Sequence, residues 1–452
     1  MNGPRQPLTS HARPESIVAW RATGAVTRSQ FLADVAALAR SLPEGDHVLN
    51  VCGDRYRFMV GLSAALVAGK VSLLPASQSP DTVRQLAASH PGLFCLHDGK
   101  GATADLPQLR YPEMSAVAEP VSVPEIEADR IAVILFTSGS TGAPVAQPKT
   151  WGSLVGNGRA EAARLGFLDE GGSSFAVVGT VPAQHSYGLE STVLLTLHGG
   201  CALWHGRPFY PADVADALAA VPRPRLLVST PFHLRALLDS QVELPATDLV
   251  LSATAPLSAG LAREVEVRLG GTLIEIYGCT EAGQLASRRT SITPSWTLLA
   301  DIRLDQQDGV TFASGGHVEG RQRLGDVIEL GDDGTFLLHG RHADMINIAG
   351  KRTSLAYLNH QLAAIAGVED GVFYMPDEPG AGDVEAITRL AAFVVAPGLT
   401  PGQLLQALRG RIDPVFLPRP LVFLRRLPRN ATGKLPRGEL RGLLARHAEG
   451  GS

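Results

Sequence analysis

Short apolar runs alternate with segments of helical periodicity through the first three quarters of the chain. Apolar residues recur every three or four positions in 28–42 (RSQFLADVAALARSL), which predicts an amphipathic helix, and 47–52 (HVLNVC) predicts a buried strand. Further strands are predicted at 71–76, 173–183, 201–206, 224–230, 246–256 and 271–278, and further helices at 57–70 and 231–240. This alternation favours parallel βαβ units, so we expect an α/β fold with helices on both faces of the sheet.

From about residue 296 the pattern changes to shorter strands separated by Gly and Asp. The segment 329–336 (ELGDDGTF) predicts a hairpin, because Asp-Gly supplies the positive φ that a tight turn needs. After Gly340 a smaller α+β pattern follows. We therefore expect a large N-terminal domain of layered α/β subdomains with a small β-barrel-like part (1–340), and a small mobile C-terminal α+β domain (341–452).

Composition and charge exclude several classes of protein. The 452 residues are 45% hydrophobic and 19% charged, which suits packed cores and at least two domains. A net charge of −4 does not indicate the basic surface that nucleic-acid binding needs. The longest apolar stretch, 58–69, is shorter than the ~20 residues of a membrane helix, so we expect no membrane insertion. The four cysteines are widely spaced and fit no metal site, which indicates a reduced, cytoplasmic protein.

A turn rich in glycine and hydroxyl groups follows a predicted buried strand at 131–136 (IAVILF). Backbone N–H groups in such a turn can surround an anion, whereas a flexible linker is the plainer alternative. A Walker phosphate loop is excluded, because Ala143 rather than lysine follows Gly142.

The segment TSGSTGAP resembles the phosphate loop of the adenylate-forming superfamily, which includes acyl-CoA synthetases, amino-acid adenylation domains and luciferases. The resemblance implies that the nucleotide phosphates are bound by Thr137, Ser138, Gly139, Ser140, Thr141 and Gly142. The family loop continues as Gly-x-Pro-Lys, but here four residues separate Pro144 from Lys149. An insertion or a displaced lysine therefore leaves the nucleotide-binding role of Lys149 open.

Two further segments are similar to nucleotide-binding motifs of this superfamily. In YGCTEAG the resemblance implies that Tyr277 and Gly278 adjoin adenine, that Thr280 meets the α-phosphate and that Glu281 binds Mg²⁺, a cation that prefers carboxylate and phosphate oxygens. The plainer alternative is a strand-to-helix turn capped by the threonine. The family's GGAPL appears here as ATAPL, which adds Thr254, Ala255 and Pro256 to the nucleotide site and changes one wall of the acid pocket.

The C-terminal third carries the remaining motifs of the resemblance. Asp326 would accept hydrogen bonds from the ribose hydroxyls, Arg341 would lie near the ribose and phosphates, and Asp344 would be the hinge of the small domain. Asp326 and Asp344 could equally be ordinary turn residues. The segment LPRNATGKLPRGEL matches the family's lysine loop, so Lys434 is the candidate catalytic lysine. Its ammonium would stabilise the negative charge that builds up around the α-phosphorus during attack.

The segment VPAQHSYGLES resembles the family's Pro-x-x-His-x-x-Gly segment and places His185, also a candidate catalytic residue, beside the substrate carboxylate. No acidic residue stands where amino-acid adenylation domains pair the substrate's amine, so an α-amino acid is disfavoured. The expected substrate-binding residues are His185, Ser186, Gly188, Ser229, Thr254, Cys279 and Gly283.

The resemblance implies an AMP-forming ligase that activates an aryl or short to medium acyl acid with ATP and Mg²⁺. The acyl group would then pass to coenzyme A or to the phosphopantetheine arm of an acyl carrier protein. The alternatives are a luciferase-like adenylating oxidase, a nucleotide-binding regulator and an inactive homologue.

Overall fold

The computed structural model describes residues 3–75, 77–99, 105–113, 122–138, 144–168, 174–331, 333–341, 345–348, 351–376, 389–429 and 435–449. Within these ranges, no helix has both the length and the apolar character that a membrane crossing requires.

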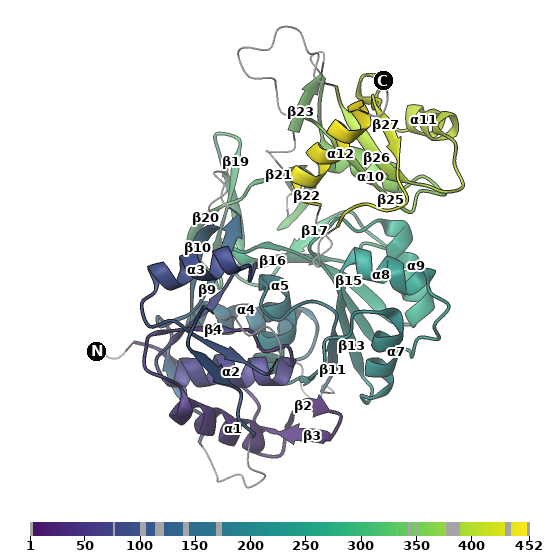
Figure 1. Ribbon diagram of the computed structural model, residues 1–452. Helices are drawn as coiled ribbons and strands as arrows, with labels where there is room; N and C mark the ends of the chain where they lie inside the picture. The colour runs from purple at the N-terminus through teal and green to yellow at the C-terminus, as the bar shows by residue number, and fades with distance from the viewer. Residues whose placement is uncertain are drawn as a thin grey trace.

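The central feature is a mixed sheet of eleven strands (Figure 1). In spatial order its strands are β21 (Asp326–Leu330), β22 (Thr335–Arg341), β17 (Trp296–Leu298), β16 (Gly283–Arg288), β15 (Thr272–Cys279), β14 (Leu249–Ser252), β13 (Arg225–Ser229), β11 (Ala176–Gly179), β12 (Ala202–Trp204), β2 (Ile17–Arg21) and β3 (Gly24–Thr27). The run from β15 to β2 is parallel, and the strands outside it are antiparallel. The predicted parallel βαβ units are thereby confirmed.

Alternate residues of the parallel strands enter two different cores, as the period of two in a strand requires. Val178 and Leu227 pack with helices α7 (Pro211–Ala219), α8 (Pro231–Asp239) and α9 (Ala259–Leu269). Val177 and Val228 pack on the opposite face, against α4 (Trp151–Arg164) and the helical segment of α5 (Ser186–Gly188), the π-helical turn η1 (Leu189–Leu194) and α6 (Leu195–Gly199). Helices therefore cover both faces, as predicted.

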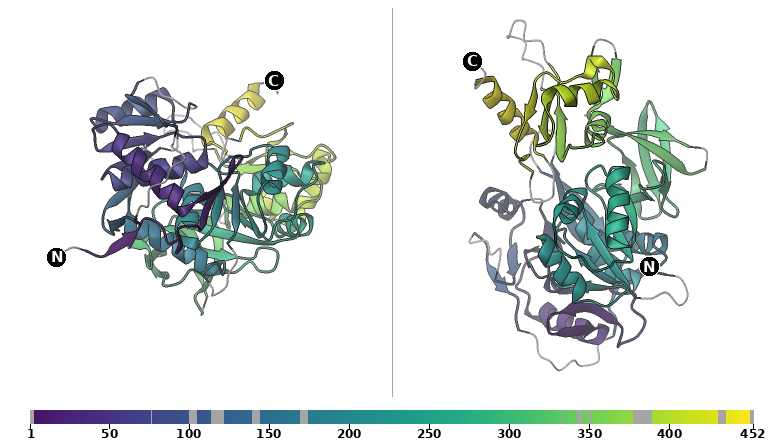
Figure 2. Two further views of the ribbon diagram at one scale, coloured as in Figure 1. Left: turned by 90° about the horizontal axis from the view of Figure 1, so that it is seen from below. Right: turned by 90° about the vertical axis from the view of Figure 1, so that its right-hand side faces the viewer.

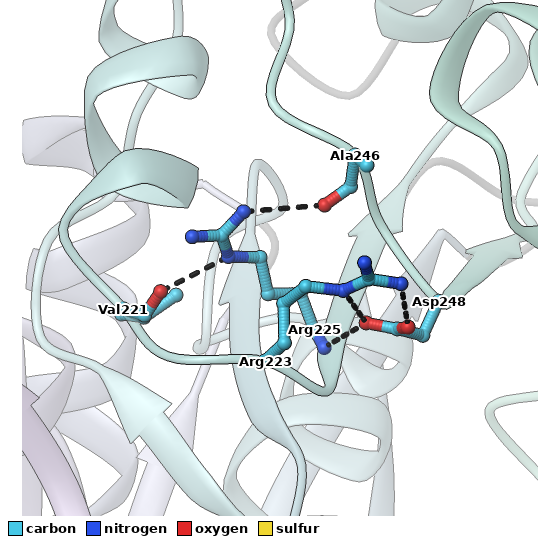
Figure 3. A network of polar contacts seen from close by, with 5 residues as sticks. All are labelled: Val221, Arg223, Arg225, Ala246 and Asp248. Carbon is cyan, nitrogen blue, oxygen red and sulfur yellow. Dashed lines mark hydrogen bonds and ion pairs between the residues drawn. The ribbon is translucent and has the colours of Figure 1, made fainter.

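A network of polar contacts fixes the start of β13 (Figure 3). The Asp248 carboxylate accepts hydrogen bonds from the Arg223 side chain and, at 2.7 Å, from the Arg225 backbone amide. The Arg225 side chain donates to the carbonyls of Val221 at 3.0 Å and Ala246 at 3.3 Å. The hydrogen bond from Arg223 is the main cause of a lowered Asp248 pKa. The segments that lead into β13 and into β14 are thus tied together at the amino ends of these two strands.

A second sheet of six strands forms the other N-terminal layer. Its strands in spatial order are β10 (Pro144–Thr150), β9 (Ile131–Ser138), β5 (Val71–Leu74), β4 (His47–Asn50), β6 (Phe94–His97) and β7 (Gln108–Arg110). One face packs on α1 (Arg28–Ser41) and α2 (Arg55–Val67), and the other on α3 (Pro80–Ser89). Helix α2 begins two residues before the predicted start, because the Asp54 side chain caps it by accepting from the Arg57 amide at 2.9 Å.

The strand predicted at 131–136 is confirmed as β9, and it is followed by a hairpin strand rather than by a helix. Strand β10 pairs antiparallel with β9, with Pro144 opposite Ser138 and Lys149 opposite Val133. Helix α4 starts only after β10, where the Thr150 side chain accepts from the Ser153 amide at 3.3 Å. The hydroxyl-rich loop at 139–143 lies outside the described residues.

The region that the sequence predicts as barrel-like contains an antiparallel sheet of β18 (Arg303–Gln307), β19 (Val310–Gly315) and β20 (Val318–Arg323). The predicted hairpin at 329–336 is confirmed, since β21 and β22 pair with Leu330 opposite Phe336. Gly334 has a φ of 74°, the positive value expected of the glycine in this turn. A further pair, β1 (Arg5–Pro7) with β8 (Glu125–Glu127), lies near the N-terminus.

The C-terminal elements gather at one end of the molecule, beyond β17 and β22 (Figures 1 and 2). A sheet of β25 (Asp370–Tyr374), β26 (Ala391–Val395) and β27 (Leu421–Phe423) packs on α10 (Leu355–Ala363) and α11 (Pro401–Arg409), and on α12 (Arg437–Glu449) with its other face. The hairpin of β23 (Met345–Ile348) and β24 (Lys351–Ser354) precedes them. These residues form cores of their own, while the exact domain boundary at 340/341 stays a prediction.

Candidate active site

The segment YGCTEAG forms the turn between β15 and β16, which pair antiparallel with Cys279 opposite Gly283. The strand-to-helix alternative is therefore wrong. A Cβ atom on Gly278 would lie 2.3 Å from the Gly283 carbonyl oxygen, so only glycine allows the two strands to approach this closely. Thr280 and Glu281 are placed at the tip of this turn.

Tyr277 and Asp326 lie side by side although 49 positions separate them. The Tyr277 hydroxyl donates to Asp326 Oδ2 at 2.8 Å. The Tyr277 ring packs with Trp296 and Phe336, each at a centroid distance of 5.6 Å, so its position is fixed by a small aromatic core. The structure thus brings together two residues that the resemblance assigns to the adenosine part of the nucleotide.

Lys149 contacts the same turn from strand β10. Its side chain is 6% exposed, and its ammonium donates a hydrogen bond to the backbone carbonyl of Glu281. A buried ammonium needs such partners because desolvation is costly. Lys149 is displaced along the sequence, yet in space it lies against the residue expected to bind the metal.

Two buried carboxyl groups lie on neighbouring helical segments, Glu161 on α4 and Glu190 on η1. Glu161 accepts from Ser191 at 2.6 Å, and burial raises its pKa to about 7. Glu190 accepts from Ser186 at 2.9 Å, and burial raises its pKa to about 8, against an opposing effect of Lys149. At neutral pH Glu190 is therefore mainly protonated and supplies little negative charge to its surroundings.

A pocket opens beside this network, with an empty volume of about 280 Å³, part of which is open to solvent. It is lined by Val181, Pro182, His185, Tyr187, Gly188, Thr230, His233 and Thr254. Gly188 packs so closely on Pro182, which also lines the pocket, that a Cβ would lie 1.9 Å from the Pro182 carbonyl oxygen. The pocket lies at the carboxyl ends of β11, β13 and β14, where open α/β sheets bind their ligands.

Of the substrate residues predicted from the sequence, His185, Gly188 and Thr254 line this pocket. Ser229 lies behind its wall, fully buried. The other three are not among the lining residues. Ser186 donates a hydrogen bond to Glu190, and Gly283 packs beside Asn157 and His317. Cys279 lies in β15, where burial raises the pKa of its thiol to about 12.

Sequence reasoning missed Tyr187, Thr230 and His233. For Thr230 and His233 the available signal was the segment STPFH, residues 229–233. Two hydroxyl residues end a strand there and a proline starts a helix, so these side chains lie at the carboxyl edge of the sheet.

Thr254 adopts a φ of 78° in the wall of this pocket. A β-branched residue is a clear outlier in the left-handed region, and such strain is concentrated at functional sites. The threonine stands where the family motif has glycine, which adopts this conformation without strain. Ala255 and Pro256 follow it, and Leu257 returns to the core.

Several expected site residues lie outside the described residues, namely Gly139, Ser140, Thr141, Gly142, Asp344 and Lys434. Thr137 is half-buried at the end of β9, and Ser138 and Arg341 end β9 and β22.

The described flanks of the lysine loop are both anchored near β25. The Arg429 guanidinium binds the Asp370 carboxylate with two hydrogen bonds, of 2.8 and 2.6 Å. Arg437 donates to the Met375 carbonyl at 3.2 Å. The start and the end of the segment that carries Lys434 are therefore fixed to one strand of the C-terminal sheet.

Among the described residues, no group of three or more His, Cys, Asp or Glu side chains could hold a metal ion by itself. Mg²⁺ is commonly held by one or two carboxylates together with substrate phosphates. Glu281 lies at the tip of its turn, and its role as a ligand of Mg²⁺ stays a prediction.

The comparisons with known proteins agree with this geometry. Residues 9–302 match the family of AMP-binding enzymes. The 4-coumarate–CoA ligase of Rhodobacter capsulatus is 30% identical over 305 residues, which cover 67% of this chain and 74% of that protein. A feruloyl-CoA synthase of Amycolatopsis is 28% identical over 366 residues, covering 72% of each chain.

Solved structures share the fold over nearly the whole chain. The O-succinylbenzoate coenzyme A synthetase of Bacillus subtilis in complex with AMP has a TM-score of 0.79 at 20% identity and covers 97% of this chain and 98% of its own. ATP-bound MatB of Rhodopseudomonas palustris has a TM-score of 0.75 at 20% identity and covers 96% of both.

The chain belongs to the AMP-binding enzyme family of the adenylate-forming superfamily. It is an ATP-dependent, AMP-forming ligase of the acyl-CoA synthetase type, which joins a carboxylic acid to the thiol of coenzyme A.

Proposed function

We propose that this ligase activates a small aryl acid in the pocket that His185, Tyr187, His233 and Thr254 line. The single observation that carries the assignment is the convergence of distant motif residues: Tyr277 donates to Asp326 and Lys149 to the Glu281 carbonyl, while the predicted substrate residues His185, Gly188 and Thr254 line one pocket. The names of the relatives add support, since 4-coumarate–CoA ligase and feruloyl-CoA synthase act on aryl acids.

In the first step a carboxylate oxygen attacks the α-phosphorus of ATP, and the bond to pyrophosphate breaks. We assign Tyr277 and Gly278 to adenine, Asp326 and Arg341 to the ribose, and Thr280 with the loop 137–142 to the phosphates. Thr254, Ala255 and Pro256 would complete the nucleotide site. Positioning and charge neutralisation suffice for such a transfer, because little covalent chemistry is needed from the protein. Mg²⁺ on Glu281 would neutralise phosphate charge.

The acid pocket favours a substrate without a positive charge. No described Asp or Glu side chain lines it, and the nearby Glu190 is largely protonated at neutral pH. An ammonium group would therefore be buried without a counter-charge, which costs several kcal/mol or more. His185 lies in the wall, where we expect it to meet the substrate carboxylate.

In the second step a thiolate attacks the acyl carbon and AMP leaves. We propose that the segment 341–452 rotates about Asp344 between the two steps, so that Lys434 serves adenylation only. Coenzyme A is the acceptor of the class, and a carrier-protein phosphopantetheine arm is a finer alternative that the same thiol chemistry allows. The four cysteines are thiols outside any disulfide, which suits the reduced cytoplasm that we propose as its location.

Carboxylate-dependent exchange of labelled pyrophosphate into ATP tests the adenylation step directly. Exchange is expected with aryl acids such as benzoates and cinnamates and is not expected with α-amino acids. A nucleotide-binding regulator or an inactive homologue would show no exchange with any acid. An adenylating oxidase would consume oxygen in the presence of acid, ATP and thiol. Product analysis with coenzyme A and with a carrier protein then separates the two acceptors.

A further inference from the structure

A row of buried hydrogen-bonding groups ends at the wall of the acid pocket. The Thr180 hydroxyl lies 3.0 Å from the Ser229 hydroxyl and 2.9 Å from Nδ1 of His233. The three side chains are between 0% and 6% exposed. They come from the ends of β11 and β13 and from the first turn of α8, so three elements of the fold converge on them.

One ring nitrogen of His233 has no partner in the part of the chain that the structure describes. Its Nε2 is buried and finds no hydrogen-bond partner among the described residues, while the residue itself lines the pocket. Burial, with a smaller effect of Arg207, lowers the pKa of His233, so the ring is neutral at neutral pH. A buried polar atom without a partner destabilises the site, and a hydrogen bond from a ligand atom removes that cost.

The surroundings hold this imidazole in place. The ring of Phe209 packs edge-on against it at a centroid distance of 5.5 Å. The buried guanidinium of Arg55 donates to the carbonyls of Gly179 at 2.8 Å and Val181 at 2.9 Å, and so fixes the backbone on either side of Thr180. A hydrogen-bonding group held in this way is pre-organised for a ligand.

We propose that His233 selects acids that carry a second, neutral hydroxyl group. This inference rests on the proposed function, because it names the substrate class of the same pocket. A hydroxyl can donate and accept, so it satisfies Nε2 whichever tautomer Thr180 imposes on the ring. A second charged group is disfavoured, because no described Lys, Arg, Asp or Glu lines the pocket.

The test measures kcat/KM for pyrophosphate exchange with matched acids: benzoate against 3- and 4-hydroxybenzoate, cinnamate against 4-hydroxycinnamate, and terephthalate as the dicarboxylate. For the wild-type enzyme, the best of the hydroxylated acids is expected to exceed its unsubstituted analogue in kcat/KM by at least about tenfold, because a site built for a hydroxyl rejects the analogue that lacks it. His233→Leu is expected to reduce this preference, taken as the ratio of kcat/KM for the hydroxylated acid to that for its unsubstituted analogue, to less than about threefold.

Two further variants separate recognition from folding. His233→Gln keeps a hydrogen-bonding side chain and should restore part of the preference. His198→Leu is the matched control, because His198 is equally buried and also has an Nε2 without a described partner, but it does not line the pocket. It should leave the preference unchanged.

The possible failures are distinguishable. A wild-type enzyme that uses unsubstituted and hydroxylated acids equally, or that prefers the dicarboxylate, overturns this inference and leaves the ligase function in place. A preference that survives in His233→Leu also overturns it. Absence of exchange with every acid in the panel overturns the proposed function itself.

Discussion

The ammonium of Lys149 donates a hydrogen bond to the backbone carbonyl of Glu281, 132 positions further along the chain. The lysine comes from the second strand of the β9–β10 hairpin, and Glu281 from the turn between β15 and β16. The contact joins the two sheets of the N-terminal part at the place where the nucleotide is proposed to bind.

Replacing Lys149 with Met should weaken adenylation. A hydrogen bond from a charged group to a buried carbonyl contributes about 1.5–3 kcal/mol, so kcat/KM for ATP should fall roughly ten- to a hundredfold in pyrophosphate exchange. The apparent affinity for Mg²⁺ should fall as well, because the turn that carries Glu281 loses its anchor. Lys70→Met is the matched control, since Lys70 also donates to a carbonyl, that of Gly45, away from the site. An equal loss in both variants would contradict a specific role.

Tyr277→Phe should raise the KM for ATP. The substitution keeps the ring between Trp296 and Phe336 and removes only the hydroxyl that orients Asp326. The loss of one hydrogen bond of about 1 kcal/mol corresponds to a change of roughly fivefold, with little effect on the KM for the acid. Tyr56→Phe removes a similar bond, to Asp34 at 2.6 Å, and should leave both constants unchanged. A shift in the acid KM alone would argue against an adenosine site here.

Lys434→Ala should separate the two half-reactions. Removing this ammonium takes away charge stabilisation during attack on phosphorus, where one such group contributes about 10²–10³ in rate. The rate of adenylation, measured by pyrophosphate exchange, should fall by that factor. The rate of thiol transfer from preformed acyl-adenylate should change little. Lys351→Ala, which removes an exposed partner of Asp413 in the same C-terminal segment, should affect neither step. Equal loss in both half-reactions would exclude the proposed rotation.

Thr254→Gly should widen the range of acids without a loss of stability. Glycine adopts a φ of 78° freely, so relief of the strained threonine offsets the entropy that glycine loses on folding, each about 1 kcal/mol. The side chain lines the pocket, and its removal should raise kcat/KM for bulkier acids relative to benzoate. Asp308→Gly, at a φ of 52° in the β18–β19 turn, should leave the acid range unchanged. Unchanged selectivity in Thr254→Gly would mean that this wall does not contact the acid.

Glu161→Gln should change how stability depends on pH. The folded-state pKa of Glu161 is raised from 4.5 to about 7, so the folded protein binds the proton more tightly than the unfolded chain. The wild-type protein therefore loses stability as pH rises from about 4.5 to 7, and this contribution then levels off. The glutamine variant lacks this loss and can still accept the hydrogen bond from Ser191.

Urea unfolding at pH 5 and pH 8 measures this effect. The free energy of unfolding of Glu161→Gln, relative to wild type, should increase by on the order of 2 kcal/mol between the two pH values. Glu264→Gln, at an exposed position, should show no such change. A constant difference for Glu161→Gln across this range would mean that the buried carboxyl is ionised throughout.

The sequence by itself determined the elements and the class. The short continuous apolar run in 224–230 and the helical period in 28–42 are local features of the sequence, so β13 and α1 were predictable from neighbouring residues. The nucleotide motifs carried the superfamily in the same way, because each is a short contiguous segment. Asp-Gly in 329–336 likewise fixed a hairpin.

Only the tertiary structure decided which distant side chains meet. Three features depend on how two sheets and their helices pack: the contact of Lys149 with Glu281, the raised pKa values of Glu161 and Glu190, and the Nε2 of His233, which has no partner among the described residues. Burial removes water from a charged or polar group, and its consequence depends on the partners that remain within reach. No periodicity along the chain encodes these contacts, because they are set by the packing of different elements; Lys149 and Glu281, for example, are 132 positions apart.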